Sequence, residues 1–159
     1  MPPPLDDIDA QILRLLQADG RLPKQKLADA VGLSAAATHE RIKRLTDEGY
    51  ILGFEAVLNP AKLAAGMLVF AEVRLEYTGA GVADAFRDAV QQRPEILECY
   101  EVAGSFDYMI KTRVADMIAY RDLVAAVVWR LPGVRDLRTF AVVEEIKHTA
   151  RIAVRVSLP

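Results

Sequence analysis

Apolar residues recur at spacings of three and four along the first fifty residues, a pattern typical of amphipathic helices. The spacing predicts a first helix with Ile8 and Ile12 on its buried face, a second at 24–31 and a third at about 35–48. Asp6 is expected to cap the first helix and Gly20 to end it in a left-handed turn. Gly32 is expected to close the second helix, and Ser34 to cap the third.

The rhythm changes after residue 50. The stretch "YILGFEAVLNP" alternates and is rich in β-formers, so it predicts a strand that kinks at Asn-Pro. The same reasoning predicts further strands at 66–77, 95–103, 108–114 and 134–146, and helices at 81–93 and 116–131. The order βαββαβ is that of a ferredoxin-like sandwich, an α+β fold with two helices on one face of an antiparallel sheet.

Composition limits the possible functions of the chain. With 52% hydrophobic residues it can bury a core. A formal net charge of −2 and a pI near 5.7 argue against nucleic-acid binding through overall charge, so any such binding needs a local basic patch. No apolar run approaches the roughly 20 residues of a membrane span, and no signal peptide is apparent. We therefore expect a soluble, cytoplasmic protein with a loose arm at Pro2–Pro4.

Catalytic and metal-binding patterns are weak. The single cysteine, Cys99, excludes an intramolecular disulfide and a multi-cysteine metal site, while His39 and His148 lack a ligand cluster. There is no phosphate loop, nucleophile elbow or paired-carboxylate site. The sequence thus predicts a protein that is not an enzyme and needs no cofactor or metal.

The stretch "LADAVGLSAAATHERIKRL" has the features of a DNA-reading helix pair: a short helix, a glycine turn and a second helix with a slim leading end. The alternative is a solvated amphipathic helix that ends in basic residues. Residues near the start of the second helix would contact base edges or phosphates. The basic residues of that helix would contact the DNA backbone. The candidate DNA-binding residues are Ser34, Ala36, Thr38, His39, Arg41, Lys43 and Arg44.

These motifs, together with "ECYEVAGSFDYMIKTRVADMIAYRDLV", "LPGVRDLRTF" and "VVEEIKHTARIAV", resemble the Lrp/AsnC (feast/famine) family of transcription factors along essentially the whole chain. The resemblance implies a winged helix-turn-helix at 1–50 that binds double-stranded DNA. It further implies a wing and hinge strand at 51–65 and a ferredoxin-like effector-binding and oligomerisation domain at 66–159. Family members form dimers that often assemble into octamers.

The resemblance also implies an amino-acid effector, with leucine or another branched-chain residue as the first expectation. It places the effector around a Gly-x-x-Asp turn, where glycine exposes N–H groups for a carboxylate and Asp107 accepts from an ammonium. Without the family, Asp107 would be interpreted as a turn aspartate. Ser105 stands where the family frequently has an acidic residue. The candidate effector residues are Tyr100, Gly104, Ser105, Phe106, Asp107, Met117, Thr139 and Phe140.

A different class of function stays open at this stage. The sandwich could itself be a small-molecule-binding or enzymatic domain, with the N-terminal helices serving only for dimerisation. The missing catalytic dyad and the basic third helix argue against it.

Overall fold

A computed structural model describes residues 5–76 and 81–156 of the chain. The chain forms two compact units, one of Met1–Val57 with Lys147–Pro159 and the other of Leu58–Ile146. The division differs from the expected domains in two respects: the expected hinge segment 51–65 is divided between the two units after Val57, and the C-terminal residues join the N-terminal helices rather than the sheet. The proposed arm at Pro2–Pro4 lies outside the described residues.

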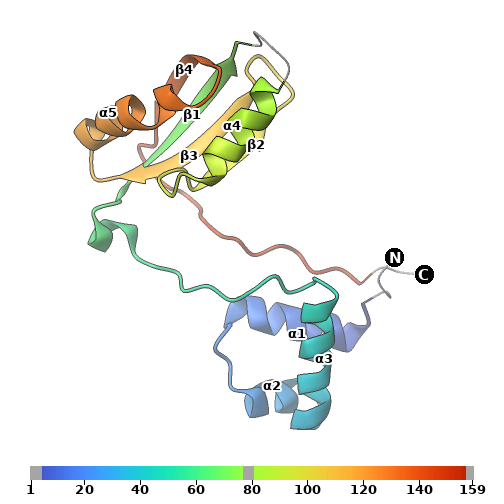
Figure 1. Cartoon of the computed structure of the whole chain (residues 1–159). Helices are drawn as coiled ribbons and strands as arrows, with labels where there is room; N and C mark the ends of the chain where they lie inside the picture. The colour runs from blue at the N-terminus through green and yellow to red at the C-terminus, as the bar shows by residue number, and fades with distance from the viewer. Residues whose placement is uncertain (1–4, 77–80, 157–159) are drawn as a thin grey trace. The chain divides into compact units, whose positions relative to one another are not determined.

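The first unit is built on three helices, α1 (Asp7–Ala18), α2 (Lys24–Val31) and α3 (Ala35–Asp47), which are drawn in blue to teal in Figure 1. The predicted caps of α1 and α3 are confirmed. The Asp6 carboxylate accepts from the Asp9 N–H at 2.7 Å, and the Ser34 hydroxyl accepts from the Ala37 N–H at 3.2 Å. The apolar faces meet in one cluster whose fully buried members include Ile12, Leu27 and Leu45.

Two predictions for this unit are wrong. Helix α1 ends at Ala18, and its C-cap residue Asp19 is extended; the expected left-handed turn at Gly20 does not form. The expected strand at 50–60 does not form: the chain there is extended but pairs with no other strand, and a 3-10 helix η1 follows at Pro60–Leu63. An alternating pattern needs a neighbouring strand to become a sheet, and the single chain supplies none here among the described residues.

The second unit is an antiparallel sheet with strand order β2-β3-β1-β4. The strands are β1 (Met67–Leu75), β2 (Glu98–Glu101), β3 (Tyr108–Val114) and β4 (Val134–Ala141). Helices α4 (Val82–Gln91) and α5 (Met117–Ala126) both pack on one face (Figure 1). The predicted βαββαβ order and ferredoxin-like fold are confirmed.

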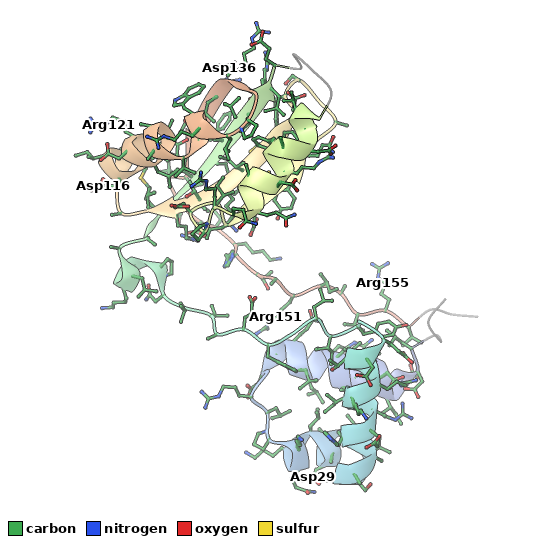
Figure 2. All side chains as sticks on the ribbon, in the orientation of Figure 1. Asp29, Asp116, Arg121, Asp136, Arg151 and Arg155 are labelled. Carbon is green, nitrogen blue, oxygen red and sulfur yellow. The ribbon has the colours of Figure 1, made fainter. Side chains whose placement is uncertain are left out.

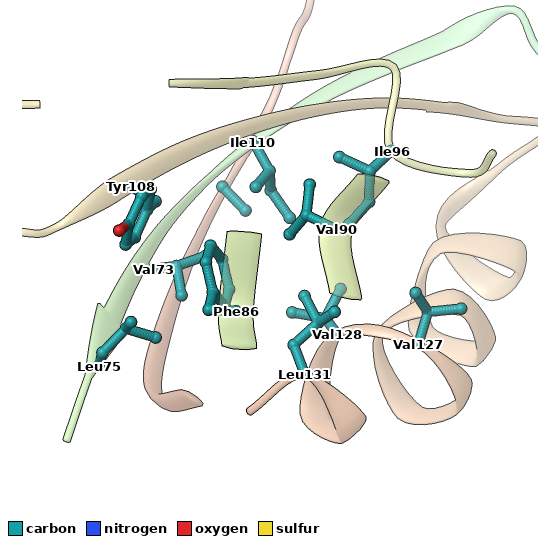
Figure 3. Packing of buried hydrophobic residues seen from close by; sticks show 11 residues of the cluster. Val73, Leu75, Phe86, Val90, Ile96, Tyr108, Ile110, Val127, Val128 and Leu131 are labelled. Atoms are coloured by element: carbon teal, nitrogen blue, oxygen red, sulfur yellow. The ribbon is translucent and has the colours of Figure 1, made fainter. Parts of the chain in front are cut away.

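The helix-covered face of the sheet holds the core of this unit. Val73 in β1, Tyr108 and Ile110 in β3, and Phe86 in α4 are all buried and lie together in Figure 3. The Phe86 and Tyr108 rings pack at 4.5 Å between centroids. Because side chains alternate along a strand, the intervening residues of β1 and β3 lie on the opposite face, which no helix of this unit covers.

Other element boundaries differ from the predictions. The expected helix at 116–131 is divided into α5 and the 3-10 helix η2 (Val128–Arg130), and β4 ends at Ala141 rather than at residue 146. Residue Tyr77, the expected end of the first strand, is outside the described residues. Among the helices that the structure describes, none is long and apolar enough to cross a membrane.

Gly133 gives a test of the packing in this unit. Its φ is +73°, and an added Cβ would lie 2.3 Å from Val82 Cγ1 in α4. We expect Gly133→Ala to lower the free energy of unfolding by about 1–3 kcal/mol, because both backbone strain and overlap oppose it. Urea unfolding followed by fluorescence of the sole tryptophan, Trp129, reports on this unit. Gly66→Ala, whose nearest new contact is 3.5 Å, is the control; equal stability of both variants would contradict the packing described.

Candidate functional sites

The turn between α2 and α3 sets the direction of α3. Gly32 is left-handed, with φ 70° and ψ 31°, and the Leu33 N–H donates to the Ala28 carbonyl at 3.0 Å. Ser34 then starts α3 at once. The two helices are thus joined through three residues, Gly32, Leu33 and Ser34, a short turn as the helix-turn-helix interpretation requires.

Two predicted DNA-contacting arginines face inward. Arg41 Nη1 lies 2.6 Å from Asp6 Oδ2 and 2.7 Å from Asp9 Oδ1, and Arg44 donates to the other oxygen of Asp9. Only 1% of the Asp9 side chain is exposed. Both arginines of α3 are therefore paired with carboxylates at the start of α1.

The ion pairs shift the pKa values of Asp6, Arg41 and Arg44. Hydrogen bonds to Asp6 and then Asp9 raise the pKa of Arg41, and the hydrogen bond to Asp9 raises that of Arg44. Burial raises the pKa of Asp6, but the Asp9 N–H and the Arg41 guanidinium outweigh it and bring the pKa below its ordinary value. These pKa shifts favour the charged forms of Asp6, Arg41 and Arg44.

Thr38 is also directed into the protein. Its side chain is fully buried, and its hydroxyl donates to the Ser34 carbonyl at 3.0 Å. The prediction that Thr38 contacts DNA is wrong for this geometry, because the residue packs α3 against the helical core. The sequence spacing places Thr38 on the same helix face as the apolar residues Ile42 and Leu45, and this spacing indicates a buried position.

Four predicted residues are exposed on α3 and at its cap: Ser34, Ala36, His39 and Lys43. His39 Nδ1 lies 3.3 Å from the Nζ of Lys24, the first residue of α2. An ammonium has only donors, so Lys24 donates to the unprotonated ring nitrogen. This exposed face therefore carries two basic side chains, Lys24 and Lys43, beside small residues.

A cavity of about 490 Å³ opens at one end of the sheet, where β1 ends and β4 begins. The turn Gly104–Asp107 forms one wall. The Asp107 N–H donates to the Val73 carbonyl at 3.0 Å, and its Oδ2 accepts from the Leu75 N–H at 2.8 Å. Asp107 thus ties the turn to β1, instead of capping only its own turn.

Three charged residues of this cavity were missed from the sequence: Arg74, Arg135 and Asp136. Arg74 in β1 is the cross-strand partner of Asp136 in β4, which is labelled in Figure 2. Arg135 and Asp136 stand in the motif "LPGVRDLRTF", but Arg74 meets them only through the β1–β4 register. Two guanidinium groups and two carboxylates line one cavity, a set that suits a zwitterion.

The remaining predicted effector residues do not line this cavity. Tyr100 in β2 donates its hydroxyl to Glu98, and Met117 begins α5. Thr139 and Phe140 are neighbours in β4 on opposite faces of the sheet: Thr139 contacts the Tyr120 hydroxyl at 2.9 Å, while Phe140 lies 5.3 Å below the Arg138 guanidinium. Within this unit, the structure brings only Gly104, Ser105, Phe106 and Asp107 together.

Comparison with known proteins agrees with both halves of the chain. Residues 5–51 match the model of the winged helix-turn-helix DNA-binding family, and residues 68–152 match that of the Lrp/AsnC ligand-binding domain. The chain is 47% identical to the leucine-responsive regulatory proteins of Klebsiella pneumoniae and Escherichia coli K12, over 95% of its length and 92% of theirs. The chain belongs to the Lrp/AsnC family.

Solved structures of Lrp/AsnC regulators share the whole fold. A transcriptional regulator from Neisseria meningitidis in complex with L-methionine superposes with a TM-score of 0.88 at 32% identity, over 93% of this chain and 96% of the other. An AsnC family regulator from Agrobacterium tumefaciens gives 0.87 at 30% identity, with the same coverage.

The family assignment decides between the two classes of function. As an Lrp/AsnC protein, the chain is a DNA-binding transcription regulator with a domain for an amino-acid effector. The helices belong to a DNA-binding unit and are not a simple dimerisation extension.

Asp9→Asn tests the role of the ion-pair cluster. The amide cannot hold two guanidinium groups, so we expect the docking of α3 on α1 to weaken by at least about 2 kcal/mol. Native-state hydrogen exchange of α3 amides measures this locally. Asp7→Asn is the control, because Asp7 is exposed in the same first turn and forms no ion pair within the described residues. Unchanged exchange in Asp9→Asn would show that the cluster does not hold α3.

Proposed function

We propose that α3 lies in the major groove of DNA with Ser34, Ala36, His39 and Lys43 toward the duplex. The observation that carries the proposal is the division of α3 into two faces. One face is buried or ion-paired, and the other is exposed and slim at its leading end. Small side chains there suit a groove about 12 Å wide.

The roles of the remaining candidates follow from this orientation. Arg41 and Arg44 position α3 by binding Asp9, and Thr38 packs it on the core. Lys43, and Lys24 from the adjacent helix, are the cations available to phosphates on this face. His39 and Ser34 provide polar groups for base edges or phosphates.

The regulator acts as a homodimer in this proposal. The helix-free face of the sheet carries Phe70, Tyr100, Met109 and Phe140, a partly exposed apolar surface. The unpaired segment after α3 exposes Leu52 and Val57 almost completely, at 97% and 96%. A second copy would cover such surfaces. It would also place two recognition helices one turn of DNA apart, about 34 Å. In this proposal the dimers assemble further into octamers. The protein is proposed to be cytoplasmic.

The effector in this proposal is an amino acid bound at the cavity beside the Gly104–Asp107 turn. Arg74 and Arg135 supply donors for its carboxylate, and Asp136 supplies an acceptor for its ammonium. Of the lining residues, Leu75 and Phe106 are the apolar ones, and they would take the side chain of leucine or another amino acid. Effector binding changes the affinity for DNA only if the effector binds one assembly more tightly than another.

Lys43→Gln tests the DNA-facing side of α3. The loss of one phosphate contact is expected to lower the slope of log affinity against log salt by about 0.9 per contact. Fluorescence anisotropy with a labelled duplex across a salt series measures the slope. Lys62→Gln, an exposed lysine of η1 in the other unit, is the matched control. If both variants retain the wild-type slope, α3 does not lie on DNA in the proposed orientation.

Arg135→Gln tests the effector cavity. Thermal shift with the common amino acids first identifies the ligands, and calorimetry then compares the variants. We expect affinity to fall at least about tenfold, because a hydrogen bond to a charged group contributes about 1.5–3 kcal/mol. Arg138→Gln, on the same strand but outside the cavity, should bind as the wild type does. Equal affinity of Arg135→Gln and wild type would place the effector elsewhere.

A further inference from the structure

The C-terminal tail, residues 147–156, is held on α1 by its backbone. The Gln17 side chain donates to the Ile152 carbonyl at 3.0 Å and accepts from the Ile152 N–H at 2.8 Å. Arg14 donates to the Val154 carbonyl at 3.0 Å, and Arg151 donates to the Ala18 carbonyl at 3.3 Å. Gln17 thus satisfies both backbone groups of one residue, and the tail lies antiparallel to α1.

The tail also lies at the end of α3. Val154 packs against the same apolar cluster as Tyr50 and Ile51, the residues that follow α3. The N–H groups of Tyr50 and Ile51 both donate to the Leu45 carbonyl, at 2.8 and 3.1 Å. Tail, α1 and the C-terminal end of α3 therefore share one core.

The tail reverses the charge of the DNA-binding unit. Residues 1–57 contain 7 basic and 9 acidic residues, a formal net charge of −2. The tail adds Lys147, Arg151 and Arg155 and no acidic residue, which brings the unit to +1. DNA repels a unit that is negative overall, and the tail removes that repulsion.

Two cations of the tail are available to a partner. Lys147 and Arg155 are exposed, and neither forms an ion pair with the residues that the structure describes. Arg155 projects from the tail away from α1 in Figure 2. By contrast, Arg151 is used at the end of α1, a helix whose last turn has no basic residue of its own.

We propose that the C-terminal tail is a second DNA-contacting element, whose Lys147 and Arg155 bind phosphates beside the groove that α3 enters. The fixed backbone reduces the ordering cost that a free basic tail would bear on binding. The contact compensates for Arg41 and Arg44, which α3 uses for ion pairs with Asp9. It goes beyond the proposed function, which needs only the exposed face of α3 and Lys24.

The test compares full-length variants on one labelled duplex long enough for two major-groove half-sites, by anisotropy across a salt series. In Lys147→Gln/Arg155→Gln we expect the slope of log affinity against log salt to fall by about 0.9 for each lost phosphate contact. Lys147→Arg/Arg155→Lys keeps both charges and should keep the wild-type slope. Arg155→Gln alone should show a smaller decrease in the same direction.

The matched control is Lys62→Gln/Arg121→Gln, which removes two exposed charges from the other unit. An equal decrease in the control would attribute the effect to net charge and overturn the proposal. The proposal would also be overturned if Lys147→Gln/Arg155→Gln kept the wild-type slope of log affinity against log salt. This holds even if sedimentation shows that the double variant assembles differently. If that double variant does not fold, the slope of Arg155→Gln decides. Wild-type protein that binds no DNA would overturn the proposed function as well, so the two failures are distinguishable.

Discussion

The buried carboxylate of Asp9 is the constraint on which the DNA-binding unit depends. Burying a carboxylate is costly unless its charge is paired and its oxygens accept hydrogen bonds. Here one oxygen accepts from Arg41 and the other from Arg44, one helical turn apart on α3. A rotation of α3 about its axis would leave that charge unpaired. The pairing therefore fixes which face of α3 is exposed, and it makes α1 part of the DNA-reading apparatus.

The cost of this arrangement is that α3 has one unpaired basic side chain left, Lys43, along its described length. The remaining positive charge must come from other elements. In our proposal the C-terminal tail supplies this positive charge. The tail also changes how the two units are connected along the chain. Because Lys147–Pro159 belongs to the unit of Met1–Val57, the sheet is inserted between two parts of the DNA-binding unit. Two covalent connections, one before β1 and one after β4, thus join the sheet to the DNA-binding unit.

Local chemistry explains why much of this was predictable. Helix α2, the Gly32 turn and the Ser34 cap depend on residues within a few positions of one another, and the sequence predicted all three. The strands of the sheet also followed from alternation. Asp9 and Arg41 are 32 residues apart, and Arg74 meets Asp136 only through strand register. No local pattern contains such pairs. The expected strand at 50–60 failed for a related reason, since a strand exists only with a partner.

In the cavity beside the Gly104–Asp107 turn, Asp107 both holds the structure together and lines the proposed effector site. By accepting from Leu75, Asp107 ties the turn between β2 and β3 to the end of β1. Arg74 and Asp136 sit on β1 and β4 at the same end of the sheet. A zwitterion held by the turn and by these charges would contact the β2–β3 turn, the end of β1 and the start of β4 at the same time. Linkage then requires that the assembly that binds such an effector more tightly is favoured by the effector by the same factor.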